Sequence, residues 1–272
     1  MAGARGLAAA GLAMVLIPAG GPAGAVESRP LRVMSLDQCG DQYALALAPA
    51  AELAVSPRAD DPDSWMRHAA AARRRVRPTL EAAIAFQPDV VIRYWGGDAR
   101  LLARLKADGV RVVTLDDATD FDGIRSNIRS AASAFGDPAR GESLIARMDA
   151  RLREAAPRAG AARRSALYLT AGGFTAGRGT LVDAMLVAAG LVNAAVLRGF
   201  APVSVERIAL SPPTHFVLGF FDQSRGDWRG PGRHPVVRAA ARDRVVAQLP
   251  AASLTCPAWF AADAAAMLGP AG

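Results

Sequence analysis

The alternation of short β-branched runs with longer helical stretches constrains the fold of this chain more than any other feature. From Leu31 onward, runs rich in Val, Ile and Leu are separated by stretches in which apolar residues recur at three- and four-residue spacing. This alternation is typical of βα units around largely parallel sheets, so the sequence predicts an α/β fold. The expected strands are residues 31–36, 89–92, 110–115, 166–169, 216–220 and 245–247, and the expected helices are residues 41–48, 80–86, 99–108, 137–156, 181–189, 205–210, 235–240 and 260–268.

One long helix, expected over residues 137–156, divides the chain into two halves. Asp137 is a good N-cap and Pro138 suits the first helical position. Twenty helical residues reach about 30 Å, enough to cross the back of two adjacent lobes. We therefore expect two βα lobes joined by one long connecting helix, with a ligand cleft between them. The expected organisation is a signal peptide at 1–25, an N-terminal lobe at 26–135, the connecting helix at 136–160 and a C-terminal lobe at 161–272.

Residues 1–25 have the pattern of a secretory signal peptide. Arg5 precedes an apolar run at 7–17, and residues 23–25 are small enough for cleavage. The run is shorter than the roughly 20 residues that a membrane-spanning helix needs. No cysteine follows it for lipid attachment. We therefore expect a soluble, freely diffusing periplasmic protein that acts as a monomer.

The net charge of +7 and the 32 Lys and Arg residues raise nucleic acid as a partner. Lys106 is the sole lysine, and the arginines are spread along the chain apart from a run at 73–77. No basic-aromatic interleaving or known nucleic-acid reader motif accompanies them. We therefore expect no nucleic-acid partner.

Motifs that would indicate an enzyme or a nucleotide site are absent. The chain has no G-x-S-x-G, and its glycine-rich segment at 172–180 has Arg and Gly where a phosphate loop needs Lys and Ser or Thr. The three histidines lie in separate segments, which disfavours a transition-metal site. We expect no catalysis and no cofactor. One alternative is a secreted α/β enzyme with Asp37 or Asp222 as its general base.

Aromatic residues follow several of the predicted strands. Loops at the carboxyl ends of parallel strands converge on one crevice, where ligands bind. Flat rings in such loops suit a large organic ligand. Cys39 and Cys256 fall in loops of the same kind, and a disulfide, free thiols and ligand contacts all remain open for them. The aromatic residues concerned are Tyr94, Trp95, Phe174, Trp228 and Trp259.

An internal repeat relates the two halves. Glu81 follows the helix cap Thr79, and Glu206 follows Ser204 in the same way. In each copy a short helix, a Pro and a strand come next. A carboxylate in the first turn stabilises a helix start, which is sufficient reason for each glutamate by itself. Equivalence across the halves favours a pseudo-symmetric docking surface.

Three segments resemble the periplasmic cobalamin- and ferric-siderophore-binding proteins of ABC importers. They are residues 32–41 (RVMSLDQCGD), 80–92 (LEAAIAFQPDVVI) and 94–99 (YWGGDA), and residues 204–208 (SVERI) add the second half. With the long helix, the resemblance covers essentially the whole chain after the signal peptide. It implies a receptor that holds a metal chelate between two lobes and delivers it to an ABC importer permease.

The resemblance also implies roles for particular residues. Glu81 and Glu206 match the acidic residues that pair with permease arginines in this family. Arg178 and Arg225 would suit an anionic ferric siderophore; a corrinoid of the cobalamin type is the other expected ligand, and heme or a free metal ion are alternatives. The expected ligand-contacting residues are Asp37, Gln38, Tyr94, Trp95, Phe174, Arg178, Trp228 and Trp259.

Overall fold

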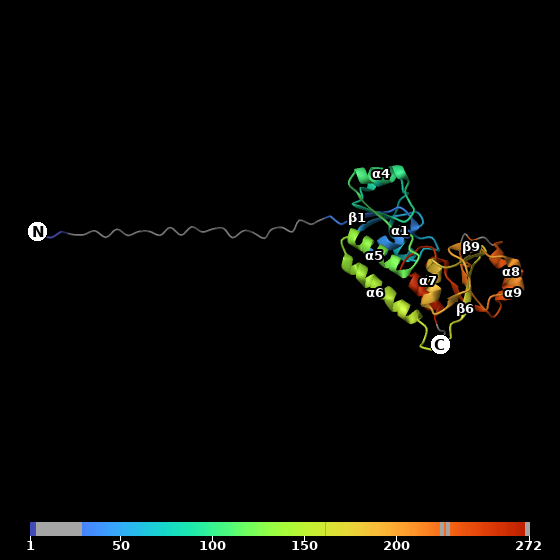
Figure 1. Ribbon diagram of the computed structural model, residues 1–272. Helices are drawn as coiled ribbons and strands as arrows, with labels where there is room; N and C mark the ends of the chain where they lie inside the picture. Colours follow the sequence, from blue (N-terminus) through green and yellow to red (C-terminus); the bar gives the residue numbers. More distant parts are fainter. Residues whose placement is uncertain (4–28, 161, 224–225, 227–228, 270–272) are drawn as a thin grey trace.

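The computed structural model describes residues 1–3, 29–160, 162–223, 226 and 229–269. Two parallel sheets lie side by side in it (Figure 1). The N-terminal sheet has the strand order β3-β2-β1-β4-β5, and the C-terminal sheet has the order β11-β10-β6-β8. Strands β7 and β9 form a separate antiparallel pair. The strands are β1 Arg32–Ser35, β2 Glu52–Val55, β3 Arg74–Arg75, β4 Val90–Arg93, β5 Arg111–Thr114, β6 Ser165–Thr170, β7 Phe174–Ala176, β8 Val192–Asn193, β9 Phe200–Pro202, β10 His215–Gly219 and β11 Val245–Leu249.

Each sheet is covered by helices on both faces. Helices α3 and α4 pack on one face of the N-terminal sheet, and α8 and α9 pack on one face of the C-terminal sheet. The opposite faces meet α1, α5, α6, α7 and α10. The helices are α1 Gln38–Leu47, α2 Arg67–Ala70, α3 Leu80–Phe86, α4 Ala99–Ala107, α5 Phe121–Ala134, α6 Pro138–Ala155, α7 Leu181–Ala188, α8 Val205–Leu210, α9 Pro235–Ala241 and α10 Ala261–Leu268.

Alternation along the strands produces this layering. Successive side chains of a strand point to opposite faces. In β1, Val33 belongs to the core shared with α1 and α5, whereas Met34 belongs to the core under α3 and α4. Both side chains are fully buried, as expected for an inner strand of a parallel sheet covered on both sides.

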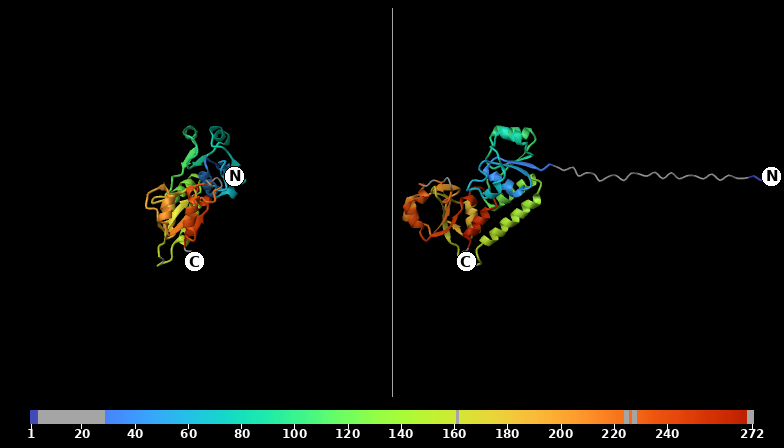
Figure 2. Two further views of the ribbon diagram at one scale, coloured as in Figure 1. Left: turned by 90° about the vertical axis from the view of Figure 1, so that its right-hand side faces the viewer. Right: turned by 180° about the vertical axis from the view of Figure 1, so that it is seen from behind.

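One hydrophobic core joins the two sheets. It contains Val33 of the N-terminal sheet, Tyr168 of the C-terminal sheet, and Met148 of the long helix α6 between them in sequence. Helix α6 runs along α5 at one end and meets α10 (Figures 1 and 2). The fold class expected from the sequence is confirmed. Among the described residues, no helix combines the length and apolar character needed to cross a membrane.

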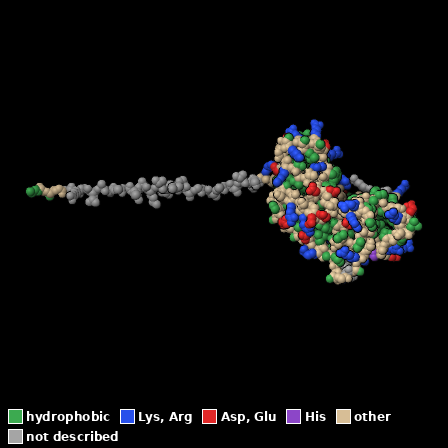
Figure 3. Space-filling model, in the orientation of Figure 1, with side chains coloured by type: hydrophobic (Ala, Val, Ile, Leu, Met, Phe, Trp, Pro, Cys, Tyr) green, Lys and Arg blue, Asp and Glu red, His purple; other side chains and the backbone are tan. Residues whose placement is uncertain are grey.

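Several elements were not expected from the sequence: β2, β3, α2, α5, β7, β8 and β9. The helix expected at 41–48 begins earlier, at Gln38, because the Asp37 side chain accepts hydrogen bonds from the first backbone N–H groups. Basic side chains are scattered over the visible surface instead of gathering in one patch (Figure 3).

Candidate functional site

A cavity of about 750 Å³ opens between the two sheets, at the edges where their parallel strands end. Tyr94, Asp117, Ala118 and Thr119 contribute from the N-terminal half. The other lining residues come from the C-terminal half, among them the aromatic residues Tyr168, Phe174, Phe200 and Phe220. The cavity volume falls in the range of about 300–1,000 Å³ that is usual for small-molecule sites.

Asp37 lies behind the wall of the cavity that the N-terminal half forms, and it holds the backbone of that wall in place. Its Oδ1 accepts hydrogen bonds from the backbone N–H groups of Cys39 (3.0 Å) and Gly40 (2.9 Å) at the start of α1. Its Oδ2 accepts three more from the turn after β4, from Tyr94 (2.7 Å), Trp95 (3.0 Å) and Gly96 (2.7 Å). The side chain is 1% exposed. Asp37 therefore fixes the turn that presents Tyr94 to the cavity.

Gly96 is required for this close approach. A Cβ atom at position 96 would lie 2.3 Å from the carbonyl oxygen of Leu36, a contact with backbone that no side-chain movement relieves. The Trp-Gly-Gly turn can therefore fold back over the end of β1. This leaves Trp95 on the outside, 56% exposed, next to but not among the residues that line the cavity.

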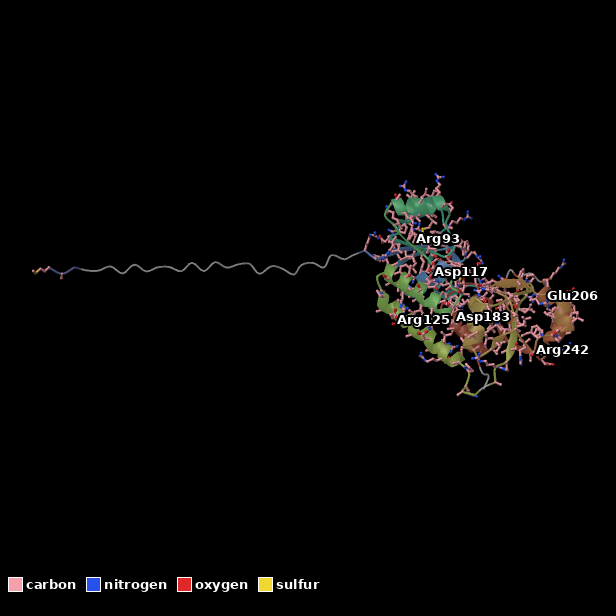
Figure 4. The ribbon with its side chains drawn as sticks, in the orientation of Figure 1. Arg93, Asp117, Arg125, Asp183, Glu206 and Arg242 are labelled. Carbon is pink, nitrogen blue, oxygen red and sulfur yellow. A yellow bond between two sulfur atoms is a disulfide. The ribbon has the colours of Figure 1, made fainter. Side chains whose placement is uncertain are left out.

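Tyr94 and Asp117 form a hydrogen-bonded pair inside the cavity. The Tyr94 hydroxyl donates to Oδ1 of Asp117 at 2.6 Å. Burial raises the pKa of Tyr94, and the hydrogen bond to the negative Asp117 raises it further, so this phenol stays protonated and donating. Asp117 follows β5, and its neighbour Asp116 is held by two hydrogen bonds with Asn127 of 2.9 Å each. Figure 4 shows Asp117 where the two halves meet.

The C-terminal wall is mainly aromatic. Phe174 and Phe200 come from the antiparallel pair β7 and β9, and both rings are at least half exposed. Tyr168 comes from β6 and is 1% exposed. Its hydroxyl has no hydrogen-bond partner among the described residues, and burial raises its pKa. These rings offer a large apolar surface to a ligand that enters the cavity.

A disulfide joins Cys39 and Cys256, with their Cα atoms 5.4 Å apart. Of the three alternatives for these cysteines, the structure has the disulfide. Cys256 lies between Thr255 and Pro257, which line the cavity. The Tyr43 hydroxyl of α1 also donates to the Pro257 carbonyl oxygen at 2.8 Å. The segment that forms one side of the cavity is therefore fastened to α1.

Of the eight residues expected to contact the ligand, Tyr94 and Phe174 line the cavity. The structure gives Asp37 a structural position beneath it, as described above. Gln38 is also buried beneath it, where its Nε2 donates to the Ser64 hydroxyl at 2.7 Å. Trp95 is exposed and is not among the lining residues.

Two of the other three expected contacts border other hollows. Arg178 borders a different hollow together with Asp183 and Asn193. Trp259 is buried against Tyr43, edge to face with ring centroids 5.6 Å apart, and it borders a hollow beside α6. Trp228 lies outside the described residues, as does Arg225.

Asp117, Tyr168 and Phe200 line the cavity and were missed in the sequence. Asp117 follows an expected strand, so the rule of loops after strands applied to it. Tyr168 lies within a strand, and the rule applies only to loops that follow strands. Phe200 belongs to β9, which was not expected.

Both general bases considered for an enzyme accept hydrogen bonds from backbone N–H groups. Asp37 is saturated by backbone donors, and Asp222 accepts the backbone N–H of Ala251 at 3.0 Å. Within the described part of the chain, no three His, Cys, Asp or Glu side chains come together in a way that could hold a metal ion.

Glu81 and Glu206 occupy equivalent places. Each stands exposed in the first turn of a short helix, α3 or α8, that leads into a central strand, β4 or β10. The pKa of Glu81 is lowered by its own backbone N–H and by Thr79. The pKa of Glu206 is lowered by the Ser204 hydroxyl, which donates to Oε2 at 2.7 Å, and by its own backbone N–H. Figure 4 shows Glu206 at the far end of the C-terminal half.

Comparison with known proteins identifies relatives of this fold. A family described as periplasmic binding protein matches residues 33–251. No curated protein sequence matches the chain. A periplasmic heme binding protein from Pseudomonas aeruginosa is 26% identical, with 79% of this chain and 77% of that chain covered and a TM-score of 0.56.

Two further solved structures cover more of the chain. The periplasmic heme-binding protein BhuT, in complex with two hemes, is 24% identical with a TM-score of 0.62, and 87% of this chain and 96% of that chain are covered. The periplasmic vitamin B12 binding protein BtuF of Vibrio cholerae is 21% identical with a TM-score of 0.61, and the covered shares are 88% and 95%. Because the family match spans well over half of its length, this chain belongs to the periplasmic binding protein family, whose members bind substrates and are not enzymes.

Proposed function

We propose that this protein is the substrate-binding component of an ABC importer and that its cavity holds a large organic metal chelate, of the cobalamin or heme type. The observation that carries the proposal is the cavity of about 750 Å³ between the two sheets, lined by aromatic rings from both halves. An apolar cavity with a few polar groups is what such a ligand requires.

The names of related solved structures support this class of ligand. Proteins of the same fold are described as binding heme and vitamin B12. Both ligands are macrocycles that hold a metal ion themselves, so their receptor needs no ligating cluster of its own. A ferric siderophore is the remaining alternative. Of the two arginines expected to favour it, Arg178 borders a different hollow and Arg225 lies outside the described residues.

Delivery to a permease is the second part of the proposal. We propose residues 1–25 as an export signal, residues 26–135 and 161–272 as two lobes and residues 136–160 as their connector. The monomeric receptor would then dock on the permease through Glu81 and Glu206. Rim charges of this kind influence docking register and association rate more than affinity.

Calorimetric titration of the exported protein with cyanocobalamin, hemin and a ferric siderophore tests the ligand class. We expect binding of one macrocyclic chelate with a dissociation constant of micromolar or below. Replacement of Phe174 by Ala should weaken it, because the exposed ring provides apolar contact at the cavity. The surface residue Val196, which is 87% exposed and does not line the cavity, provides the matched control as Val196→Ala. Absence of binding to all three ligands would reject the proposal.

A further inference from the structure

The described lining of the cavity contains a single charged side chain, Asp117. We propose that Asp117 and Tyr168 determine ligand specificity, and that together they select an uncharged chelate bearing carboxamide groups over a chelate bearing carboxylates. This inference rests on the proposed function and specifies which of the macrocyclic chelates the site accepts.

Asp117 supplies an acceptor that the protein does not satisfy. Its Oδ1 accepts the Tyr94 hydroxyl, and Oδ2 receives no hydrogen bond from any described residue. The hydrogen bonds between Asp116 and Asn127 hold the adjoining backbone, and the Tyr94 hydroxyl orients the Asp117 carboxylate. A ligand amide N–H can donate to Oδ2. A ligand carboxylate in the same place meets a like charge, which opposes binding.

Tyr168 supplies the complementary donor. Its side chain is buried and its hydroxyl faces the cavity with no partner among the described residues. A Cβ atom at position 219 would lie 2.3 Å from this hydroxyl oxygen, so Gly219 provides the space that it occupies. Because burial raises the pKa of Tyr168, the phenol is neutral and can donate. The hydroxyl is open to the cavity, and a ligand carbonyl oxygen can accept its hydrogen bond.

A ligand that carries both hydrogen-bond donors and acceptors on its periphery satisfies the two residues. A carboxamide has both, whereas a carboxylate can accept from Tyr168 but cannot donate to Asp117. No Lys or Arg side chain lines the cavity within the described part of the chain. Arg93 is nearest in sequence to the N-terminal wall, and its Nε donates to the Gly96 carbonyl oxygen. The described wall therefore lacks a cation that would compensate a ligand carboxylate.

A matched pair of ligands isolates this selectivity. Dicyanocobinamide carries its peripheral side chains as amides, and dicyanocobyrinic acid carries the same corrin with carboxylic acids. Isothermal titration calorimetry at pH 7.5 measures both. We expect the amide ligand to bind at least about tenfold more tightly, which corresponds to about 1.4 kcal/mol.

Two variants assign the selectivity to the residues. Asp117→Asn removes the charge but keeps an acceptor for Tyr94, so it should improve binding of the acid and reduce the preference by at least about threefold. Asp243→Asn removes one charge at an exposed position outside the cavity lining and should leave the preference unchanged. Tyr168→Phe should weaken the amide ligand by about fivefold, the effect of one net hydrogen bond of about 1 kcal/mol.

The outcomes separate this inference from the proposed function. Tight binding of the acid or of hemin with no binding of the amide corrinoid would overturn the inference and leave the proposed function standing. An unchanged preference in Asp117→Asn would also overturn it, provided that circular dichroism shows the variant to be folded. Binding of no chelate at all would overturn both.

Discussion

At the scale of single residues, Asp37 organises one wall of the cavity without touching it. Its carboxylate accepts five backbone N–H groups from two segments that are far apart in sequence. Sequence analysis placed Asp37 in the correct loop and could not distinguish a ligand contact from a support beneath the ligand. Whether a carboxylate faces the cavity or the backbone depends on the turn after β4, more than fifty residues away.

Replacing Asp37 by Ala should lower the free energy of unfolding by about 3 kcal/mol, because buried N–H groups lose a charged acceptor. Urea denaturation followed by circular dichroism measures this change. Asp98→Ala removes an N-cap that accepts from Leu101 alone and should cost only about 1 kcal/mol. Equal losses in the two variants would contradict the supporting role of Asp37.

A second residue, Asp41, makes stability depend on pH. Burial raises its pKa to about 6, although hydrogen bonds from the Ser56 hydroxyl and backbone N–H partly oppose this. An unfolded Asp has a pKa near 3.9. The folded state therefore binds the proton more tightly, and this contribution to stability is present below pH 4 and lost as the pH rises through about 6.

Asp41→Asn should remove this dependence. Between pH 4 and pH 7, the wild type should lose up to about 3 kcal/mol of unfolding free energy relative to the variant. Urea denaturation of both proteins at four pH values in this interval gives the difference. A difference that stays constant across the interval would show that Asp41 does not titrate there.

At the scale of elements, helices and strands with strong local sequence patterns were predicted correctly, and most elements with weak patterns were missed. Helix α3 was expected over the residues where it occurs, because Thr79 caps it and Pro88 follows it. Strands β3 and β8 have two residues each, too few for any periodicity to show. Helix α5 was missed although Phe121, Ile124 and Ile128 have helical spacing, so here the signal was present.

In the candidate site, too, some residues could be predicted from local sequence patterns and others could not. The rule that loops after parallel strands meet at one edge led to Tyr94 and Phe174. It could not lead to Phe200, because β9 pairs only with β7 and stands apart from both parallel sheets. The wall that β7 and β9 build is set by long-range pairing, which a local pattern does not contain.

At the contact between α5 and α6, we expect a substitution that helix propensity favours to destabilise the protein. A Cβ atom on Gly141 would lie 2.6 Å from the Ala132 Cβ. Gly141→Ala should therefore lower the unfolding free energy by about 1–3 kcal/mol, although Ala is the better helix former. Ala146→Gly, on the exposed side of the same helix, should also lower it, by about 1 kcal/mol, through propensity alone. Thermal denaturation measures both, and a stabilised Gly141→Ala would show that the helices separate easily.

At the scale of the whole molecule, the two sheets are parts of one body. They share a hydrophobic core, α6 meets both halves, and the disulfide fastens α1 to the Thr255–Pro257 side of the cavity. Such a construction favours limited closure around a ligand. The exposed ends of α3 and α8 are then held at a nearly constant separation, as the proposed docking surface requires.

Reversing the two charges that we propose for docking, Glu81 and Glu206, should separate transport from binding. We expect the double variant Glu81→Arg and Glu206→Arg to abolish uptake of the ligand in cells while its affinity in solution stays within about twofold, because neither residue lines the cavity. Glu154→Arg on α6 makes one such charge reversal elsewhere and should support normal uptake. Uptake by the double variant at the control rate would remove the docking role.

Loss of the disulfide should loosen the cavity. Changing Cys39 and Cys256 to Ser should cost about 2–4 kcal/mol of unfolding free energy, since the bond closes a very long loop. Ligand affinity should fall as well, because Thr255 and Pro257 would lose their attachment. Dithiothreitol should reproduce both effects in the wild type and change nothing in the double Ser variant.

The placement of the two sulfur atoms also bears on how the protein matures. The chain has 2 Cys residues, separated by 217 positions, so a single intramolecular pairing exists and no scrambled isomer of one chain can form. The Cys39 thiol has no intramolecular partner until nearly the whole polypeptide, including Cys256, has been synthesised. During that interval it can react only with another molecule. Secretion at high protein concentration should therefore yield disulfide-linked dimers as the characteristic by-product. Synthesis in a reducing cytoplasm should yield chains in which the binding site lacks the Cys39–Cys256 bond.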